Sequence, residues 1–264
     1  MAAALAADAF WLEPSSLRLV RHDLTVADGR QLRGLKIAVI SDLHGGSNFI
    51  GTAKIDAVTR ITNAARPDII LLTGDYVVGV HRLLGGHHIP AETIAAHLKP
   101  LSAPLGVYAV IGNHDRWEDE AGVTRGFERA GIGVLENAPV AIRTPRGPLY
   151  LAGIGDHFTH AANPAQALAG VPRDARALCF THSPDVFPQL PPACALTVAG
   201  HTHGGQVALP LLGRLVVPSR YGQRYAIGMV REDGRTLFVS PGIGTSILPV
   251  RFGVPPEISL LTVR

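Results

Sequence analysis

The sequence predicts an α/β fold whose first half holds a largely parallel sheet. From residue 35 onward, short apolar runs alternate with helix-like segments, which is the pattern of βαβ units. The run at residues 36–41 (KIAVIS) is apolar on both faces, as expected of a strand that is covered on both sides. The chain has 264 residues, of which 47% are hydrophobic and 17% charged, so it can bury a large core and is not disordered as a whole.

The expected elements of the first half alternate between helix and strand. Residues 52–65 have the periodicity of an amphipathic helix, and residues 68–73 (DIILLT) are expected to form a second buried strand. A helix is expected at residues 91–98, a third strand at 106–111 (GVYAVI) and a further helix at 119–130.

The second half is expected to be richer in β-structure, with one short helix at residues 163–168. Asp233-Gly234, between two of its strands, predicts a tight hairpin. The second half of the chain contains polar residues that a functional site formed by the first half is expected to require. We therefore expect residues 35–264 to form a single domain, preceded by an N-terminal stub and lead-in segment at residues 1–34. The strand candidates, separated mostly by Pro and Gly, are residues 140–143, 149–152, 176–181, 196–199, 225–231, 236–240 and 257–263.

The N-terminal residues 1–12 are apolar, but they contain Asp8 and lack a basic n-region. They are also shorter than the roughly 20 residues that cross a bilayer as a helix. The sequence therefore predicts no complete signal peptide or transmembrane helix. A cytoplasmic and a membrane-associated location both stay open, the latter through peripheral contact of this N-terminal segment with a membrane.

The cysteines and the net charge give no support to several other classes of protein. Cys179 and Cys194 lie in apolar runs, so we expect two small core residues, not a disulfide or a thiolate metal site. The formal net charge of +3 is too small to support nucleic acid as a partner.

Clusters of polar residues follow the buried strands along the whole chain. Because ligand sites in open α/β sheets lie at the carboxyl ends of strands, we expect these clusters to converge on one edge. Holding so many Asp, Asn and His side chains together without a ligand would cost roughly several kcal/mol. Oxygen and imidazole ligands without thiolate favour Mn, Fe or Zn, and the number of candidate ligands favours two divalent ions. The clusters are Asp42-Leu43-His44, Gly74-Asp75, Gly112-Asn113-His114-Asp115, Thr181-His182 and Gly200-His201-Thr202-His203-Gly204-Gly205.

In order and spacing, these motifs resemble the five-part signature of the calcineurin-like metallophosphoesterase superfamily. The flanking segments VISDLHGG, THSPDVF and GHTHGGQ and the C-terminal SPGIGTSILPVRFGVPPEISLLTV resemble the bacterial YkuE/YaeI-type phosphodiesterases. The resemblance covers the chain from about residue 35 to its C-terminus. It implies a four-layer α/β/β/α sandwich, in which two β-sheets are flanked by helices and the metals lie at one sheet edge.

The resemblance also implies the ligands of two metal ions. A bridging carboxylate suits ions about 3.5 to 4 Å apart, and metal coordination can lower the pKa of water to about 7, so a metal-bound hydroxide is the expected nucleophile. The implied ligands are Asp42, His44 and His203 for one ion, Asn113, His182 and His201 for the other, and Asp75 as the bridge.

Two further residues are predicted to be catalytic. His114 directly follows the ligand Asn113 and is, by the resemblance, no ligand itself, so we expect it to act as general acid or transition-state donor. Asp115 either orients or charges the His114 ring or caps the N-terminus of a helix.

The expected activity is hydrolysis of a phosphoester, preferably a phosphodiester or pyrophosphate, in a small-molecule or lipid-linked substrate. One alternative is a phosphomonoesterase or protein phosphatase on the same site. The other is a non-catalytic metal-binding protein of the same fold. Since all implied ligands and His114 are present, the sequence favours the enzyme.

Three groups of polar residues are weaker candidates for substrate contacts, because ordinary loop roles explain them as well. They are His81, His87 and His88, then Asp156, His157 and His160, and finally Arg220, Arg224 and Arg251.

Overall fold

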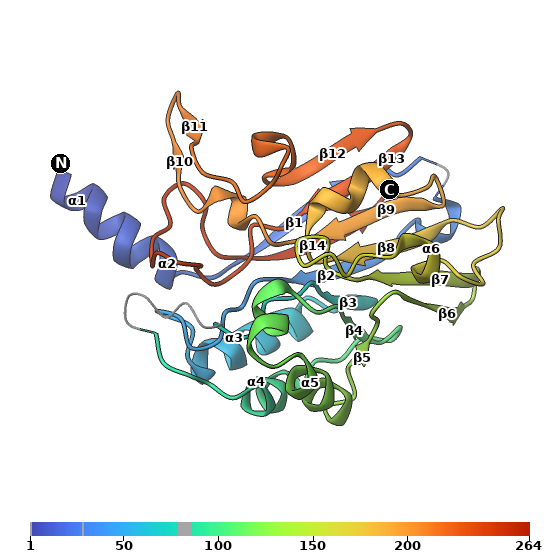
Figure 1. Ribbon diagram of the computed structural model, residues 1–264, viewed down its shortest axis with the longest axis horizontal. Coiled ribbons are helices and arrows are strands. Elements are labelled where there is room, and N and C mark those ends of the chain that lie inside the picture. Colours follow the sequence, from blue (N-terminus) through green and yellow to red (C-terminus); the bar gives the residue numbers. More distant parts are fainter. Residues whose placement is uncertain (1, 28, 79–85) are drawn as a thin grey trace.

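Two sheets stacked face to face form the centre of the protein (Figure 1). The computed structural model describes residues 2–27, 29–78 and 86–264, and the numbers of strands in the two sheets refer to these residues. The first sheet has six strands, in the spatial order β1 (Arg18–Leu24), β14 (Glu257–Val263), β2 (Lys36–Ile40), β3 (Ile69–Leu72), β4 (Val107–Ala109) and β5 (Gly133–Val134).

The second sheet also has six strands and is built from the second half of the chain. Strands β12 and β13 are antiparallel and turn at Asp233-Gly234, which confirms the predicted hairpin. A separate small hairpin, β10 (Ala208–Leu209) and β11 (Gly213–Arg214), projects from the body. The spatial order of the second sheet is β12 (Gly228–Glu232), β13 (Arg235–Val239), β9 (Cys194–Ala199), β8 (Ala177–Thr181), β7 (Gly147–Ile154) and β6 (Ala138–Thr144).

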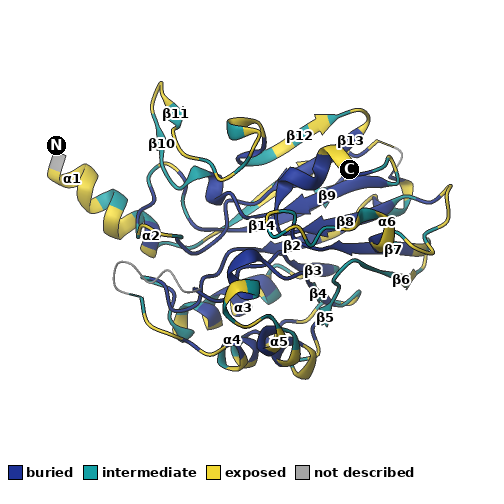
Figure 2. Cartoon of the chain, viewed as in Figure 1, coloured by how far each residue is buried: buried dark blue, intermediate teal, exposed yellow. Residues whose placement is uncertain are grey.

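Helices cover the outer faces of both sheets, so the predicted four-layer sandwich is confirmed. On the first sheet, Ala38 and Ile40 of β2 pack in one core cluster with residues of the helices α3 (Thr52–Ala64), α4 (Ala91–Leu98) and α5 (Asn113–Arg129). The alternate residues Ile37 and Val39 pack in another cluster, between the sheets, with side chains of β7, β8 and β9. Strands β2 and β3, in the middle of the first sheet, are therefore buried on both faces (Figure 2).

The outer layer on the second sheet is thin. It consists mainly of the short helix α6 (Pro164–Ala167) and the 3₁₀ segment η3 (Pro184–Gln189), whose Val186 and Phe187 pack in a third core cluster. Strand β12 begins at Gly228 instead of residue 225, because Gly222–Tyr225 forms a 3₁₀ turn.

The N-terminal segment is more structured than a stub. Residues 2–15 are helical, as α1 (Ala2–Ala7), η1 (Asp8–Leu12) and α2 (Glu13–Ser15), and β1 then joins the edge of the first sheet in parallel with β14. The Glu13 carboxylate accepts the backbone N–H groups of Gly253 and Val254 at 2.9 and 2.6 Å, which ties this segment to the body. Among the described residues, no helix combines the length and the apolar composition needed to cross a bilayer.

The expectation that Cys179 and Cys194 are unlinked is wrong, since the two form a disulfide. Both are fully buried, as predicted for core residues. They lie on the neighbouring parallel strands β8 and β9 with Cα atoms 5.6 Å apart, a separation that a disulfide spans. Strand pairing creates this proximity, and the spacing of cysteines along the chain does not reveal it.

Reduction of this disulfide is expected to lower the free energy of unfolding by about 3 kcal/mol, because the bond closes a loop of about 15 residues and restricts the unfolded chain. Urea unfolding with and without a reductant measures the difference. The double variant Cys179→Ala, Cys194→Ala should not respond to the reductant. Identical unfolding curves of the unmodified chain under both conditions would contradict the prediction.

Candidate metal centre

The predicted ligands all lie at one edge of the sandwich, at the carboxyl ends of the strands. Every one of them is buried. Asp42 and His44 follow β2, Asp75 follows β3, Asn113 begins α5 after β4, His182 follows β8, and His201 and His203 follow β9.

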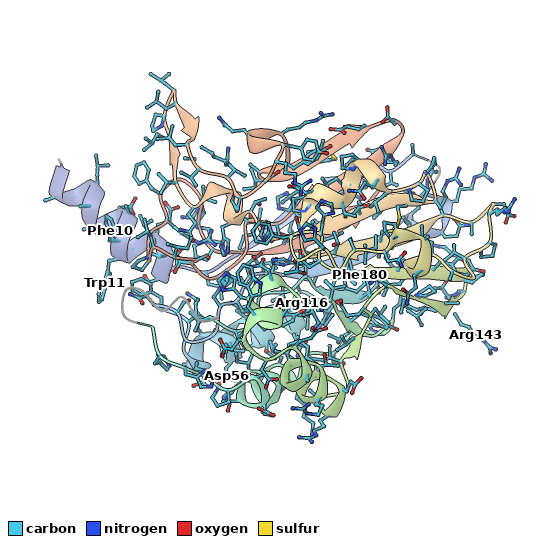
Figure 3. The ribbon with its side chains drawn as sticks, viewed as in Figure 1. Phe10, Trp11, Asp56, Arg116, Arg143 and Phe180 are labelled. Atoms are coloured by element: carbon cyan, nitrogen blue, oxygen red, sulfur yellow. A yellow bond between two sulfur atoms is a disulfide. The ribbon has the colours of Figure 1, made fainter. Side chains whose placement is uncertain are left out.

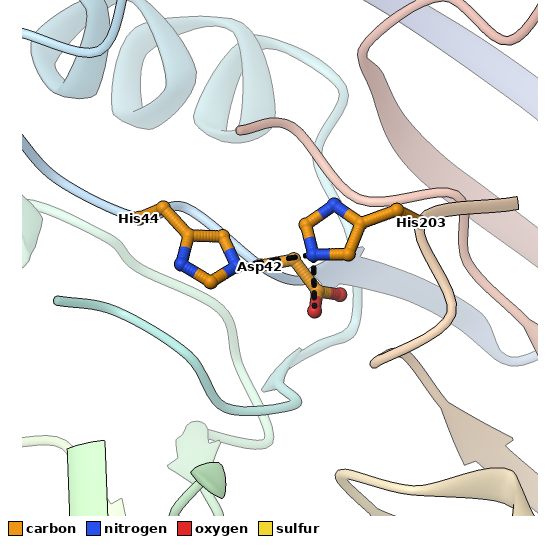
Figure 4. Close-up of side chains that lie close together, drawn as sticks. All are labelled: Asp42, His44 and His203. Atoms are coloured by element: carbon orange, nitrogen blue, oxygen red, sulfur yellow. Dashed lines mark hydrogen bonds and ion pairs between the residues drawn. The ribbon is translucent and has the colours of Figure 1, made fainter. Parts of the chain in front are cut away.

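One group of ligand atoms comes from Asp42, His44 and His203 (Figure 4). The Nε2 atoms of His44 and His203 face each other at 3.0 Å, and His203 Nε2 lies 3.5 Å from Asp42 Oδ1. Burial lowers the pKa of His44 to about 3 and that of His203 well below its usual range. Both rings are therefore neutral near pH 7 and can offer nitrogen lone pairs to a metal ion.

A second group converges on Nε2 of His182. This atom lies 3.0 Å from Asn113 Oδ1, 3.1 Å from His201 Nδ1 and 3.3 Å from Asp75 Oδ2. The other ring nitrogen, Nδ1, donates to the carbonyl oxygen of Thr73 at 2.8 Å, which fixes the ring and leaves Nε2 to the site. Although burial opposes it, the Asp75 carboxylate raises the pKa of His182, so the site favours a positive charge at this point.

Asp75 lies between the two groups. Its Oδ2 is 3.7 Å from His44 Nε2 and 3.3 Å from His182 Nε2, while Oδ1 accepts the backbone N–H of His114 at 2.8 Å. Burial alone would raise the pKa of Asp75, but His182 and His114 hold it well below its usual range. An ionised carboxylate with one oxygen near both groups has the geometry of a bridging ligand.

The backbone at this edge is strained. Positive φ angles are uncommon outside glycine and cost about 1–3 kcal/mol each, and they concentrate at functional sites. Five of the seven predicted ligands have a φ between 46° and 70°, namely Asp42, His44, Asp75, His201 and His203. With this backbone conformation, nearby polar side chains can point toward the same site. His201 and His203 are two residues apart, yet His201 lies with His182 and His203 lies with His44.

Gly200 permits the close approach of β9 to Asp42. A Cβ atom at position 200 would collide with Ser41 Oγ and lie 2.5 Å from Asp42 Oδ2, so no larger residue fits. The Ser41 hydroxyl donates to the same Asp42 carboxylate, and the backbone N–H of His201 donates to both of its oxygens at 3.1 Å. These hydrogen bonds orient the Asp42 carboxylate toward His203.

The ring of His114 is also buried at the site. It lies edge-on to the ring of His44, with centroids 4.7 Å apart, and its Nδ1 donates to the carbonyl oxygen of Val78 at 3.0 Å. His44, Asp75 and His114 together form a third group whose ligand atoms lie close enough to hold an ion. Distance therefore permits both a proton-donor and a ligand role for His114.

Asp115 caps the N-terminus of α5 and fastens the Asp75 loop to it. Its carboxylate accepts four backbone N–H groups, those of Asp75, Tyr76, Val77 and Gly112, at 2.8 to 3.1 Å. A carboxylate accepts about four hydrogen bonds, so these donors use its capacity. This favours the capping role over the orientation of His114.

Three of the weaker candidates, Arg251, Arg224 and His88, are engaged in bonds within the protein. Arg251 is fully buried and donates to the carbonyl oxygens of Pro241, Gly244 and Val254, so it anchors the C-terminal loop. Arg224 pairs with Glu232 at 2.6 Å, and His88 pairs with Glu118 at 3.1 Å, whereas His81 lies outside the described residues.

A pocket of about 360 Å³ lies beside the second group. The ring of Phe158 on its wall contacts the ring of His201, with centroids 5.0 Å apart, so the pocket adjoins the candidate ligands. The Asp185 carboxylate accepts hydrogen bonds from the Ser219 hydroxyl at 2.5 Å and from the backbone N–H of Arg220 at 2.8 Å. These bonds hold the loop at the rim of the pocket. The pocket is lined by His157, Phe158, His160, Asp185, Pro218, Ser219 and Arg220.

Sequence reasoning misses several supporting residues. Ser41 is a residue type that occurs at many positions, so its place beside Asp42 does not mark it as functional. Thr73 contributes its backbone carbonyl, a group that every residue has. Phe158 is a lone aromatic residue in a loop. The polar character of His157, His160 and Arg220 is the sequence signal for the pocket that they line together.

Comparison with known proteins identifies the class. Residues 35–205 match the family model of the calcineurin-like phosphoesterases, so the chain belongs to this family and is a phosphoester hydrolase. It is 31% identical to phosphodiesterase YaeI of Escherichia coli over 258 residues, covering 95% of this chain and 90% of the relative.

Two further relatives match over nearly the whole chain. The uncharacterized metallophosphoesterase YkuE of Bacillus subtilis is 28% identical, with 96% of this chain and 88% of the relative covered. The UDP-2,3-diacylglucosamine pyrophosphatase LpxG of Chlamydia trachomatis is 26% identical, with 95% of this chain and 90% of the relative covered. The predicted resemblance to the YkuE/YaeI-type proteins is confirmed.

Proposed function

We propose that the protein hydrolyses a phosphodiester or pyrophosphate with two divalent metal ions. The observation that carries this proposal is the position of Asp75 Oδ2, which lies within 3.7 Å of a nitrogen in each of the two ligand groups. In this proposal Asp42, His44 and His203 would hold one ion, Asn113, His182 and His201 would hold the other, and Asp75 would be shared between them.

The donor set fits divalent Mn, Fe or Zn. It consists of imidazole nitrogens, carboxylate oxygens and one amide oxygen, without thiolate. Nδ1 of His182 is occupied by the Thr73 carbonyl, and the Asp42 carboxylate is oriented by Ser41, so both side chains are prepared for binding. When bound, the ions would activate a water molecule and neutralise charge on the phosphoryl oxygens.

His114 supplies the proton for the leaving oxygen in this proposal. Because Nδ1–H of His114 donates to the Val78 carbonyl, the transferred proton is the one that Nε2 carries in the imidazolium form, and the transfer leaves a neutral ring protonated on Nδ1. Asp115 acts indirectly. By holding the backbone N–H groups of Asp75 and Gly112, it keeps the Asp75 carboxylate in place.

The pocket beside His201 suits the part of the substrate that is not attacked. Arg220, His157 and His160 can bind a second anionic group there, and Phe158 offers an aromatic face. A pyrophosphate ester has a second anionic group and a phosphodiester has a second ester substituent that can pack on Phe158, whereas a simple monoester has neither. The names of the relatives YaeI and LpxG, a phosphodiesterase and a pyrophosphatase, support the same choice of substrate.

Activity toward bis(p-nitrophenyl) phosphate is expected to exceed that toward p-nitrophenyl phosphate by about tenfold in kcat/KM with Mn²⁺, a difference of about 1.4 kcal/mol in transition-state binding. Steady-state kinetics on both substrates measures the ratio, with the same nitrophenolate released in each assay. A strong preference for the monoester would replace the proposal by the phosphomonoesterase alternative.

A further inference from the structure

Exposed apolar side chains are concentrated in three segments of the protein. Within the described part of the chain, every large hydrophobic side chain that is at least half exposed belongs to one of them. A monomeric soluble protein rarely gathers such side chains without a binding partner. The three sets are Leu5, Phe10, Trp11 and Leu12 of the N-terminal helix, Leu211, Leu212, Leu215 and Val216 of the β10–β11 hairpin, and Ile247 and Leu248 of the C-terminal loop.

The three segments meet at one place, although they are far apart in the sequence. Ala208, at the base of the hairpin, donates its N–H to the carbonyl oxygen of Phe252 at 2.8 Å. The adjacent Arg251 donates its N–H to the carbonyl oxygen of Ala9 in the N-terminal helix at 3.0 Å, and the Gln206 side chain donates to that of Leu248 at 3.2 Å. The helix and the hairpin therefore project from the same end of the molecule, which we call the apolar end (Figure 1). Figure 3 shows Phe10 and Trp11 on the projecting helix.

The charges of the hairpin and its neighbouring residues are positive. Between Asp185 and Glu232 the chain contains no Asp or Glu, and in this stretch Arg214 of β11 and Arg220 follow the start of the hairpin, while Arg224 is paired with Glu232. Residues 240–256 likewise contain no acidic residue. The N-terminal segment carries Asp8 and Glu13, of which Glu13 is engaged by the backbone N–H groups of Gly253 and Val254. Apolar side chains combined with arginine and few acids are typical of surfaces that bind anionic lipid headgroups and insert into the interface.

We propose that the apolar end docks on the surface of an anionic lipid bilayer, with the helix, the hairpin and the C-terminal loop as three points of insertion. A bilayer accommodates separate apolar projections, whereas a protein partner would need a continuous complementary face. The hairpin begins a few residues after His203–Gly205, so docking brings the candidate metal centre close to the membrane. This last consequence rests on the proposed function, but the docking itself does not.

Sedimentation of the full chain with lipid vesicles tests the proposal. We expect at least about tenfold stronger partitioning onto phosphatidylcholine vesicles that contain about 30% phosphatidylglycerol than onto phosphatidylcholine alone, and weaker binding at high salt. Two double variants should each lower partitioning at least about tenfold. One carries Leu211→Asp together with Leu212→Asp, and the other carries Phe10→Asp together with Trp11→Asp. Met229→Asp is the matched control, because Met229 is an exposed apolar residue on β12, outside the three segments.

Hydrolysis of a soluble phosphoester and circular dichroism verify that the variants are folded, since none of these residues belongs to the metal centre. No binding of the unmodified chain to either vesicle would overturn the proposal, as would Asp variants that bind like the unmodified chain. A dimer in analytical ultracentrifugation that the Leu211→Asp, Leu212→Asp variant converts to a monomer would assign the apolar end to a second copy and also overturn it.

Discussion

The variant Asp75→Ala is expected to lose both metal ions and to lower turnover by roughly 10³-fold or more, because activated water and charge neutralisation disappear together. One carboxylate oxygen lies within 3.7 Å of both ligand groups, so its removal weakens both at once. Elemental analysis after mild dialysis should find close to two ions per unmodified chain and close to none per variant chain. Turnover of a phosphodiester is measured on the same samples.

The control for this experiment is Asp56→Ala. Asp56 is a half-exposed carboxylate on α3 that pairs with His97 and belongs to none of the ligand groups, so its loss should leave metal content and turnover unchanged. If Asp75→Ala retains one ion cleanly, Asp75 serves only one group and the bridging assignment is wrong. Asp75→Asn keeps one oxygen and the shape of the side chain, so we expect weaker but measurable metal binding in that variant.

The sequence predicts correctly those strands that are buried on both faces. Strands β2 and β3 have apolar residues on both faces, and this pattern fits only a strand covered on two sides. Strand β1 (RLVRHDL) escapes prediction because it lies at the sheet edge, where half-exposed positions carry Arg, His and Asp. Helix α5 is interrupted at Asp119, whose φ of −163° is not helical and whose carboxylate accepts the backbone N–H of Gly122, so the helix predicted from residue 119 corresponds to its second part. The part that begins at Asn113 is additional and is capped by Asp115 through the backbone N–H of Gly112.

The candidate site can be predicted because its residue types are unusual at strand ends. Clusters of Asp, Asn and His after buried strands mark a ligand site even when no spacing rule is applied. The geometry cannot be predicted to the same depth. The positive φ angles of Asp42 and His201 and the carbonyl group that fixes His182 depend on tertiary packing. The disulfide escapes prediction for the same reason, since strand pairing brings Cys179 to Cys194.

The variant His114→Ala is expected to keep its metal ions and to lose about 10² to 10⁴ in turnover, the usual contribution of a positioned proton donor. The backbone N–H of His114 that binds Asp75 Oδ1 remains in the variant, so the bridging carboxylate keeps this contact. The loss should depend on the leaving group. A substrate that releases nitrophenolate needs little protonation and should be affected less than one that releases an alkoxide.

Metal analysis and kinetics on two leaving groups distinguish the roles that distance permits for this ring. The control His97→Ala removes a partly exposed imidazole that pairs with Asp56 and should change neither measurement. If His114→Ala strips an ion, His114 is a ligand of the third group, with His44 and Asp75. If the variant loses turnover equally for good and poor leaving groups, then His114 stabilises charge on the phosphoryl oxygens. In that case the acid assignment is wrong, while the two-metal proposal still stands, because it depends on Asp75 and not on His114.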